Sequence, residues 1–240
     1  MKLTIIETGL VPEPIRASFV DYPGMFRALI RASDPSISFE TVSVIKGESL
    51  PNPAGLEAIL ITGSPAGVYD DEPWMAPLME FIRAAATAEV PQVGICFGHQ
   101  AIAEALGGKV IKSPKGWGVG RHTYDVVACP GLVAKNCPTS ISIAVSHQDQ
   151  VVTLPPGAEV IARSDFTPYA GLYYAQAPAI SFQCHPEFSD AYSAALYTLR
   201  EDRLGDAAHA AVESLEIPAD NQLLGSWIVG FLKSSDQPKR

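Results

Sequence analysis

A cysteine flanked by glycines, directly after an apolar run, constrains the fold of this chain more than any other feature. The run reads Val93-Gly94-Ile95-Cys96-Phe97-Gly98-His99-Gln100. Apolar residues at helical spacing follow it, and a Gly-Gly pair then supplies a stop signal. The pattern predicts a strand that turns sharply into a helix, with the cysteine in a strained backbone position at the turn. Gly94 and Gly98 remove the side chains that would block such a turn.

In this arrangement Cys96 stands at the N-terminus of the helix. Unpaired backbone N–H groups and the positive end of the helix dipole stabilise a thiolate there, and the thiolate is the form of cysteine that attacks carbonyl carbons. From this segment alone, Cys96 could instead be a buried structural cysteine at a strand end, because free cysteine is commonly buried.

A second segment favours the reactive alternative. It reads Ala179-Ile180-Ser181-Phe182-Gln183-Cys184-His185-Pro186-Glu187-Phe188, an apolar run that ends in a histidine and an acid two residues apart. Residues i and i+2 of a strand share a face, so we expect His185 to point toward Cys96 with Glu187 on the same side. Glu187 would then accept a hydrogen bond from the imidazole and fix its orientation. Cys184 should point away and be buried.

Together the two segments resemble the class I glutamine amidotransferase family, whose marks are a cysteine elbow of the form G-x-C-x-G-x-Q and a late H-P-E. The likeness is greatest to the amidotransferase half of GMP synthase and its stand-alone relatives, and it runs from about Met1 to Leu232. The resemblance implies that Cys96, His185 and Glu187 form a triad acting on glutamine or a γ-glutamyl compound. It implies no metal and no organic cofactor.

The resemblance also implies an oxyanion hole and a glutamine-binding strip. Attack on an amide builds an oxyanion that needs donors already in place, and the first would be the backbone N–H of Phe97. The second would come from the turn after residues 58–61, where the family often has Gly-Gly; here the pair is Gly63-Ser64, so Gly63 is the expected donor. A plain strand-to-helix turn is the alternative. The residues expected to contact the substrate are Gln100, Ser146, His147, Gln148 and Asp149. Asp149 either faces the substrate's ammonium group or caps the following turn.

Alternating strand and helix patterns predict the fold class. We expect strands at 3–6, 41–45, 58–61 and 90–95, and helices at 22–32, 73–86 and after the elbow; short strands follow at 120–128, 140–145, 159–163, 171–174 and 179–184. This order predicts a flavodoxin-like three-layer α/β/α fold with a mainly parallel central sheet and antiparallel additions. We expect one domain over residues 1–240, with a C-terminal helical extension from about residue 190.

The charge of the chain limits the classes of partner that we expect it to bind. The formal net charge is −9 and Lys and Arg do not cluster, which argues against nucleic acid and an anionic membrane, since both select a basic face. No apolar run is long enough to span a membrane. The four cysteines lack zinc-type spacing, and a catalytic thiol needs a reducing compartment, so we expect a cytoplasmic protein. The oligomeric state stays open.

Three functions fit these residues. The first is an amidotransferase that passes ammonia from glutamine to a separate synthetase or other acceptor protein. The second is a stand-alone hydrolase of γ-glutamyl amides or peptides, and the third is a regulatory or binding protein that keeps the fold without turnover. The intact set of Cys96, His185 and Glu187 counts against the third.

Overall fold

The structure, a computed structural model, describes residues 1–129 and 137–235. The strands are β1 (Lys2–Glu7), β2 (Ser38–Ser43), β3 (Ala58–Ile61), β4 (Gln92–Ile95), β5 (Lys109–Lys112), β6 (Gly118–Val126), β7 (Ser140–His147), β8 (Asp149–Thr153), β9 (Ala158–Arg163), β10 (Gly171–Tyr174) and β11 (Ala179–Phe182). The α-helices are α1 (Tyr22–Ser33), α2 (Met75–Thr87), α3 (Phe97–Ala105), α4 (Asp190–Leu199), α5 (Glu201–Leu204), α6 (Ala207–Glu213) and α7 (Asn221–Ser235). Short 3-10 helices are η1 (Glu13–Ser18), η2 (Val44–Lys46), η3 (Pro53–Gly55) and η4 (Ser214–Glu216).

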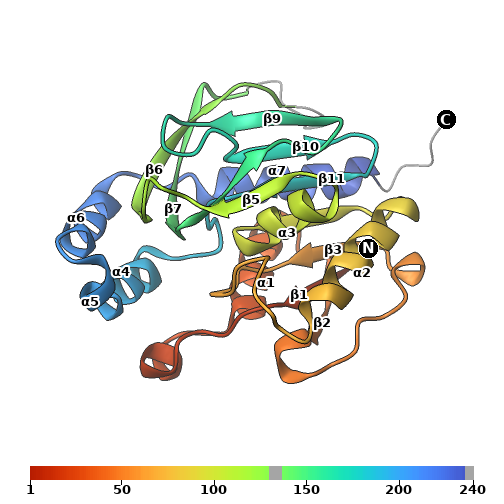
Figure 1. Ribbon diagram of the computed structural model, residues 1–240, viewed down its shortest axis with the longest axis horizontal. Coiled ribbons are helices and arrows are strands. Elements are labelled where there is room, and N and C mark those ends of the chain that lie inside the picture. Colours follow the sequence, from red (N-terminus) through yellow and green to blue (C-terminus); the bar gives the residue numbers. More distant parts are fainter. Residues whose placement is uncertain (130–136, 236–240) are drawn as a thin grey trace.

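A large sheet runs through the molecule in the order β2-β1-β3-β4-β11-β10-β9-β6-β7 (Figure 1). The strands from β2 to β11 in this order are parallel, and those from β10 to β7 pair antiparallel. β5 and β8 form a separate antiparallel pair. The structure confirms the expected flavodoxin-like α/β fold with antiparallel additions.

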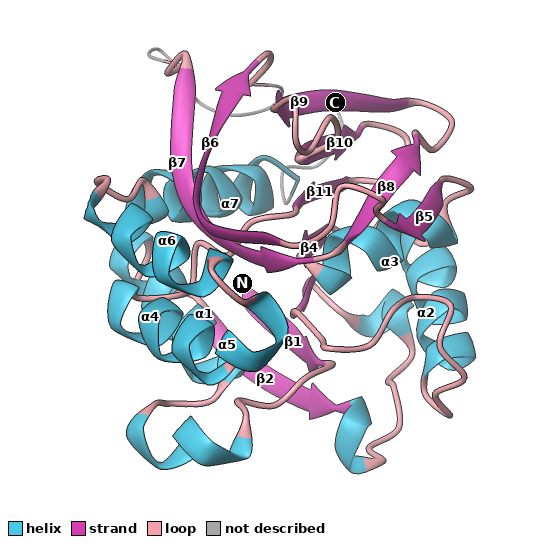
Figure 2. Ribbon diagram, turned by 60° about the vertical axis from the view of Figure 1, so that its left-hand side comes forward, coloured by secondary structure: helices cyan, strands magenta, loops and turns pink. Residues whose placement is uncertain are grey.

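Alternate side chains of the central strands enter two cores, one on each face of the sheet. In β3, Ala58 and Leu60 belong to one core, and Ile59 and Ile61 belong to the other. Side chains of α1 and α7 complete the first core, and side chains of α2 and α3 complete the second. Figure 2 shows the positions of these helices around the sheet. Because neighbouring residues of β3 enter opposite cores, the sheet forms the middle layer between two layers of helices.

The C-terminal helix α7 lies against α1. Its apolar side chains Leu224, Trp227, Ile228 and Phe231 are buried in the first core, as their helical spacing indicates.

Several strands differ from their predicted bounds by one to three residues, β2 and β11 among them. β2 covers residues 38–43 rather than 41–45, because it pairs in register with the whole of β1 and the chain then turns into η2 at Val44. β11 ends at Phe182, so His185 and Glu187 lie in the turn after the strand. The argument that these two side chains share a strand face is therefore wrong, although the turn still brings them together.

The helices α4, α5 and α6 form a group beside the sheet (Figures 1 and 2). The buried guanidinium of Arg121 in β6 pairs with Asp190, the first residue of α4. Further along α4, the Tyr197 hydroxyl donates to the carbonyl of Val145 in β7 over 2.8 Å. These contacts attach α4 firmly to β6 and β7.

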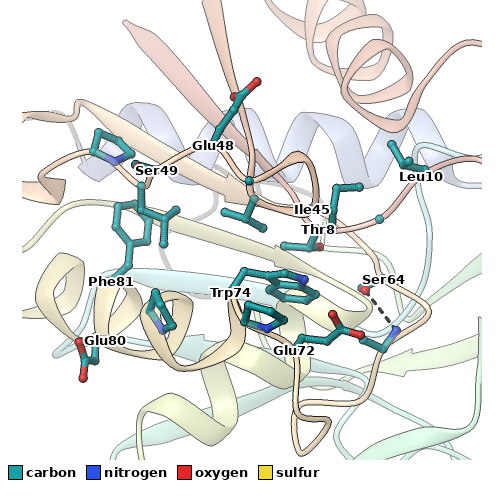
Figure 3. A pocket seen from close by; sticks show the side chains of 18 of the residues that line it. Thr8, Leu10, Ile45, Glu48, Ser49, Ser64, Glu72, Trp74, Glu80 and Phe81 are labelled. Carbon is teal, nitrogen blue, oxygen red and sulfur yellow. Dashed lines mark hydrogen bonds between the residues drawn. The ribbon is translucent and has the colours of Figure 1, made fainter.

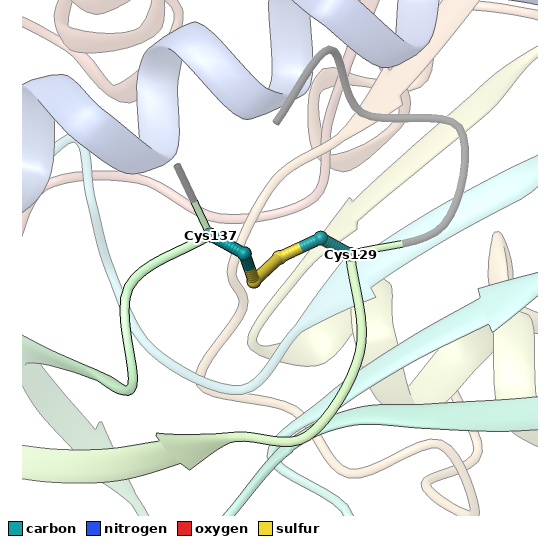
Figure 4. The surroundings of a disulfide bond; sticks show 2 residues. All are labelled: Cys129 and Cys137. Atoms are coloured by element: carbon teal, nitrogen blue, oxygen red, sulfur yellow. A yellow bond between two sulfur atoms is a disulfide. The ribbon is translucent and has the colours of Figure 1, made fainter. Parts of the chain in front are cut away.

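Cys129 and Cys137 form a disulfide between the segment after β6 and the segment before β7 (Figure 4). Cys96 and Cys184 are free and buried. The sequence pattern did not predict the bridge. Disulfides are rare in reducing compartments, and the cytoplasmic location stays a prediction. Within residues 1–129 and 137–235, no helix has the length and apolar character needed to cross a membrane.

Candidate active site

Cys96 lies in the sharp turn between β4 and α3 that the glycine pattern predicts. Its backbone angles are φ 54° and ψ −103°, and L-residues other than glycine rarely adopt a positive φ. A Cβ on Gly98 would lie 2.3 Å from the carbonyl oxygen of Ile61, and a Cβ on Gly94 would lie 2.4 Å from the carbonyl oxygen of Gly98. The close approach of α3 to the sheet therefore requires both glycines.

Backbone hydrogen bonds hold this turn in place. The N–H of Cys96 donates to the carbonyl of Phe182 in β11 over 2.8 Å, and the N–H of Gln100 donates to the carbonyl of Cys96 over 3.1 Å. Phe97 is the first residue of α3, and the first N–H groups of a helix have no acceptor within it. The Phe97 amide therefore stands beside the thiol at the positive end of the helix dipole.

His185 and Glu187 meet in the turn after β11. Nδ1 of His185 lies 2.8 Å from Oε1 of Glu187, whose side chain is 1% exposed. The imidazole stacks on Phe188, with ring centroids 3.9 Å apart and planes inclined by 6°. The backbone N–H of His185 donates to the carbonyl of Ala144 over 2.9 Å. Both the ring and the backbone of the histidine are thus fixed.

The thiol and the imidazole come together over Gly63. A Cβ built on Gly63 would lie 3.0 Å from Cε1 of His185 and 3.7 Å from Cβ of Cys96. Cys96 also lies close enough to His185 to raise the pKa of the imidazole. The structure therefore brings together the three side chains of the expected triad with the glycine expected beside them.

The surroundings of His185 favour its charged form. Burial alone would lower its pKa, because a low-dielectric environment disfavours the imidazolium. The charges of Cys96 and Glu187, with hydrogen bonds to both, outweigh burial and raise the pKa of His185 to about 10. His99 and His147 lack such partners, and burial lowers the pKa of each to about 3. At neutral pH, His185 is therefore the charged imidazole among these three.

Threonine hydroxyls anchor the turn after β3. The Thr8 hydroxyl lies 3.0 Å from the carbonyl oxygen of Thr62 and 3.2 Å from that of Gly63. The N–H of Gly98 donates to the Thr62 carbonyl over 3.2 Å. A trans peptide directs its N–H away from its C=O, so these contacts also fix the directions of the Gly63 and Ser64 amides.

The expected glutamine-binding residues line a small cavity of about 230 Å³ on one side of Cys96. The members of the predicted set in its wall are Gln100, Ser146, His147, Gln148 and Asp149. Nε2 of Gln100 donates to the carbonyl of Asp149 over 2.8 Å, and Nδ1 of His147 lies 3.1 Å from the same oxygen. Gln100 and His147 therefore hold the turn between β7 and β8 in place.

Asp149 lies in the wall of this cavity, and its role toward a substrate stays a prediction. Its Oδ2 accepts a hydrogen bond from the Tyr69 hydroxyl over 2.8 Å. Burial, together with that hydrogen bond, raises the pKa of Tyr69 to about 12. Tyr69 therefore stays a donor to Asp149 across the neutral range. In the described part of the chain, no group of three or more His, Cys, Asp or Glu side chains is placed to hold a metal ion.

A second cavity, of about 480 Å³, adjoins the first at Cys96 and includes Gly63, His185 and Glu187. A third cavity, of about 1010 Å³, lies beyond the ends of β1, β2 and β3 and does not include Cys96. Figure 3 shows the third cavity, with Trp74 beside its centre and Ser64 at its edge. Ser64 belongs to the walls of all three cavities.

Comparison with known proteins places this arrangement in a family. The model of the glutamine amidotransferase class-I family matches residues 34–196, a range that contains all three residues of the expected triad. The chain belongs to the class I glutamine amidotransferase family.

The relatives that match this chain are named for different activities. It is 30% identical over 236 residues to a glutamine amidotransferase-like protein of Schizosaccharomyces pombe, covering 91% of this chain and 93% of the relative. It is 27% identical over 230 residues to gamma-glutamyl peptidase 5 of Arabidopsis thaliana, covering 90% of each. A 136-residue match at 37% identity to the glutamine-hydrolyzing GMP synthase of Aquifex aeolicus covers 57% of this chain and 25% of that enzyme.

The fold agrees with the family. The crystal structure of a glutamine amidotransferase from Thermotoga maritima matches with a TM-score of 0.77, covering 99% of each chain at 21% identity. At that identity the likeness is one of fold.

The sequence patterns did not identify three side chains that lie at the candidate site of this chain. Arg200 and Arg203 line both cavities beside Cys96, and their guanidinium groups lie 6.0 and 5.8 Å from the ring centroid of Trp117. The arginines come from the helical group after β11, and the tryptophan precedes β6. No short motif joins these segments, so only the fold reveals their meeting.

Proposed function

We propose that this protein hydrolyses the γ-amide of glutamine or of a γ-glutamyl compound, with Cys96 as nucleophile, His185 as general acid and base, and Glu187 as the orienting acid. The meeting of the elbow thiol with the fixed His185–Glu187 pair over Gly63 carries this proposal. Family membership supports it, since class I glutamine amidotransferases are generally cysteine-dependent amide hydrolases.

The first step of the proposed reaction forms a thioester. The Cys96 thiolate attacks the amide carbon, and the amides of Phe97 and Gly63 stabilise the oxyanion, with the Ser64 amide next along the same anchored turn. His185 gives its proton to the leaving nitrogen, so the C–N bond breaks and ammonia or an amine departs. Glu187 holds the imidazole in the required tautomer and stabilises its charged form.

The second step releases glutamate. The now neutral His185 accepts a proton from water as the water oxygen attacks the thioester carbon. The C–S bond breaks, and the thiolate of Cys96 is restored beside the imidazolium. Throughout both steps the γ-glutamyl part occupies the 230 Å³ cavity, where the Asp149 carboxylate pairs with the substrate's α-ammonium group.

The fate of the nitrogen has two candidate answers. The match to a glutamine-hydrolyzing GMP synthase supports transfer of ammonia to a separate synthetase or other acceptor protein. The match to a gamma-glutamyl peptidase over most of both chains supports a hydrolase that releases its amine into solution. The two answers share the triad and differ in what leaves from the His185 side of the thiol.

The test is glutamate release by the purified protein from glutamine and from a panel of γ-glutamyl amides. Cys96→Ala should abolish release, and acid-quenched wild-type protein should carry a γ-glutamyl group on the peptide that contains Cys96. Cys184→Ala is the matched control, because burial raises the pKa of the Cys184 thiol and so keeps it protonated. Undiminished release by Cys96→Ala from any substrate would refute the proposal.

A further inference from the structure

The two cavities beside Cys96 hold different parts of the substrate, an inference that rests on the proposed function. A general acid must come within hydrogen-bond reach of the nitrogen that it protonates. His185 lines the 480 Å³ cavity and is absent from the wall of the 230 Å³ cavity. The leaving group therefore occupies the larger cavity, while the γ-glutamyl part lies with Asp149 in the smaller one.

The volume on the leaving-group side exceeds what ammonia requires. Ammonia is close in size to water, whose share of liquid volume is about 30 Å³. The cavity on the His185 side measures about 480 Å³, which falls within the usual range for a small-molecule site. A substituted amine of considerable size fits there.

Apolar side chains from distant parts of the chain line this larger cavity. They are Leu10, Pro12, Tyr22, Phe188, Leu196 and Leu199. Leu10 is 37% exposed and Leu199 is 38% exposed, so two large aliphatic side chains stand open at this one cavity. Tyr22, Phe188 and Leu196 in the same wall are buried, so this cavity offers apolar contacts to a substrate group.

Two arginines stand at the boundary between the cavities on a rigid support. Nη1 of Arg200 donates to the Ser146 hydroxyl over 2.6 Å, and the guanidinium groups of Arg200 and Arg203 both lie over the ring of Trp117. The attachment of α4 to β6 and β7 holds this end of the helix in place. Arg200 is therefore held in place, and the exposed Arg203 lies beside it over the same ring.

These guanidinium groups have no carboxylate of their own. The ion pairs between described residues include neither Arg200 nor Arg203. Of the acids in the wall of the larger cavity, Glu187 is paired with His185 and Asp202 is exposed. A guanidinium fork matches the geometry of a carboxylate, which it binds through two parallel hydrogen bonds.

We propose that the larger cavity binds the leaving amine of a γ-glutamyl amino acid, with an apolar side chain against Leu10 and Leu199 and the free carboxylate on Arg203. The substrate class is thus γ-glutamyl dipeptides with an apolar second residue. Arg203 acts as a specificity residue for the leaving group, from a position in the walls of both cavities.

A matched pair of substrates tests this assignment. γ-Glutamyl-leucine and γ-glutamyl-leucinamide differ only in the terminal carboxylate, so the ratio of their kcat/KM values measures recognition of that charge. In the wild-type protein the acid should be favoured by roughly 10-fold or more, the usual effect of a hydrogen-bonded charge pair. Arg203→Gln should collapse the ratio toward one, and Arg203→Lys should leave an intermediate ratio, because it keeps the charge but loses the fork.

Arg83→Gln is the control variant. Arg83 is an exposed arginine on α2 outside both cavities, so this change should leave the ratio as in the wild type. A wild-type ratio near one overturns the inference. So does an Arg203→Gln variant that weakens both substrates and glutamine by the same factor, since the guanidinium would then bind the α-carboxylate of the γ-glutamyl part.

Glutamine separates failure of this inference from failure of the proposed function. If glutamine is hydrolysed in a Cys96-dependent reaction while both leucine compounds are refused, the leaving-group site is wrong and the triad stands. If none of the three compounds is hydrolysed, both ideas fail. Hydrolysis of γ-glutamyl-leucine above the rate for glutamine supports the inference.

Discussion

The backbone of Cys96 makes a testable prediction about stability. At φ 54° and ψ −103°, a residue with a Cβ is strained by about 1–3 kcal/mol, and glycine at that position relieves the strain. Glycine also costs about 0.5–1 kcal/mol relative to alanine, because its unfolded chain has more freedom to lose. The difference between relief and cost is about 0–2.5 kcal/mol, so Cys96→Gly should be more stable than Cys96→Ala by up to about 2.5 kcal/mol.

Thermal and urea unfolding of the two variants check this order. In a chain of this size 1 kcal/mol corresponds to about 2–4 °C, so Cys96→Gly should melt above Cys96→Ala by up to about 10 °C. Ala84→Gly is the control, because Ala84 is an exposed residue inside α2, where glycine should destabilise by about 1 kcal/mol. If Cys96→Gly melts at or below Cys96→Ala, the elbow is not strained and the reasoning is wrong.

Further predictions concern the rest of the site. Gly63→Ala should cut the rate of glutamate release sharply with little loss of folded protein, because its Cβ would meet the stacked His185 ring at 3.0 Å; an unchanged rate would remove Gly63 from the site. Glu187→Gln should lower kcat less than loss of the base in His185→Ala does, since an orienting group contributes geometry; equal losses would give the acid a larger role. The raised pKa of His185 means that the folded state keeps a proton which the unfolded state releases above about pH 6.5. The stability that protonated His185 contributes is therefore complete below that pH and is lost as the pH rises toward 10. Over this range the free energy of unfolding of the wild type should fall relative to that of His185→Gln. Parallel plots of the free energy of unfolding against pH for the two proteins would contradict the assignment. Protein purified without reductant and then unfolded should titrate two thiols, and four after reduction; four from the outset would contradict the Cys129–Cys137 bridge.

Local patterns predicted the parts of the site that lie close together in the chain. The glycines around Cys96 predicted the elbow because steric contacts within a few residues decide that turn. The order of strands and helices predicted the sheet, because parallel strands joined by helices have few other arrangements. The expected pairing of His185 with Glu187 was met, although a turn and not a strand face makes it.

Features that distant segments of the chain form together could not be predicted from the sequence. β5 and β8 are short and pair only with each other, so neither has a periodicity strong enough to identify it. The arginine pair over Trp117 depends on where α4 and α5 are attached, and no local spacing encodes that. The disulfide likewise joins two cysteines whose spacing is common to many unpaired cysteines.

The order of strands in the sheet also decides when a growing chain could first act. β4 and β11 are neighbours with Ile95 opposite Phe182, yet six strands are synthesised between them. When the first half of the chain has emerged from the ribosome, the elbow with Cys96 is present but His185, its proposed base, is not. The triad is assembled only after residue 187 has emerged and β11 has inserted between β4 and β10, a slow, non-local pairing. Synthesis itself therefore keeps the proposed triad incomplete in an unfinished chain.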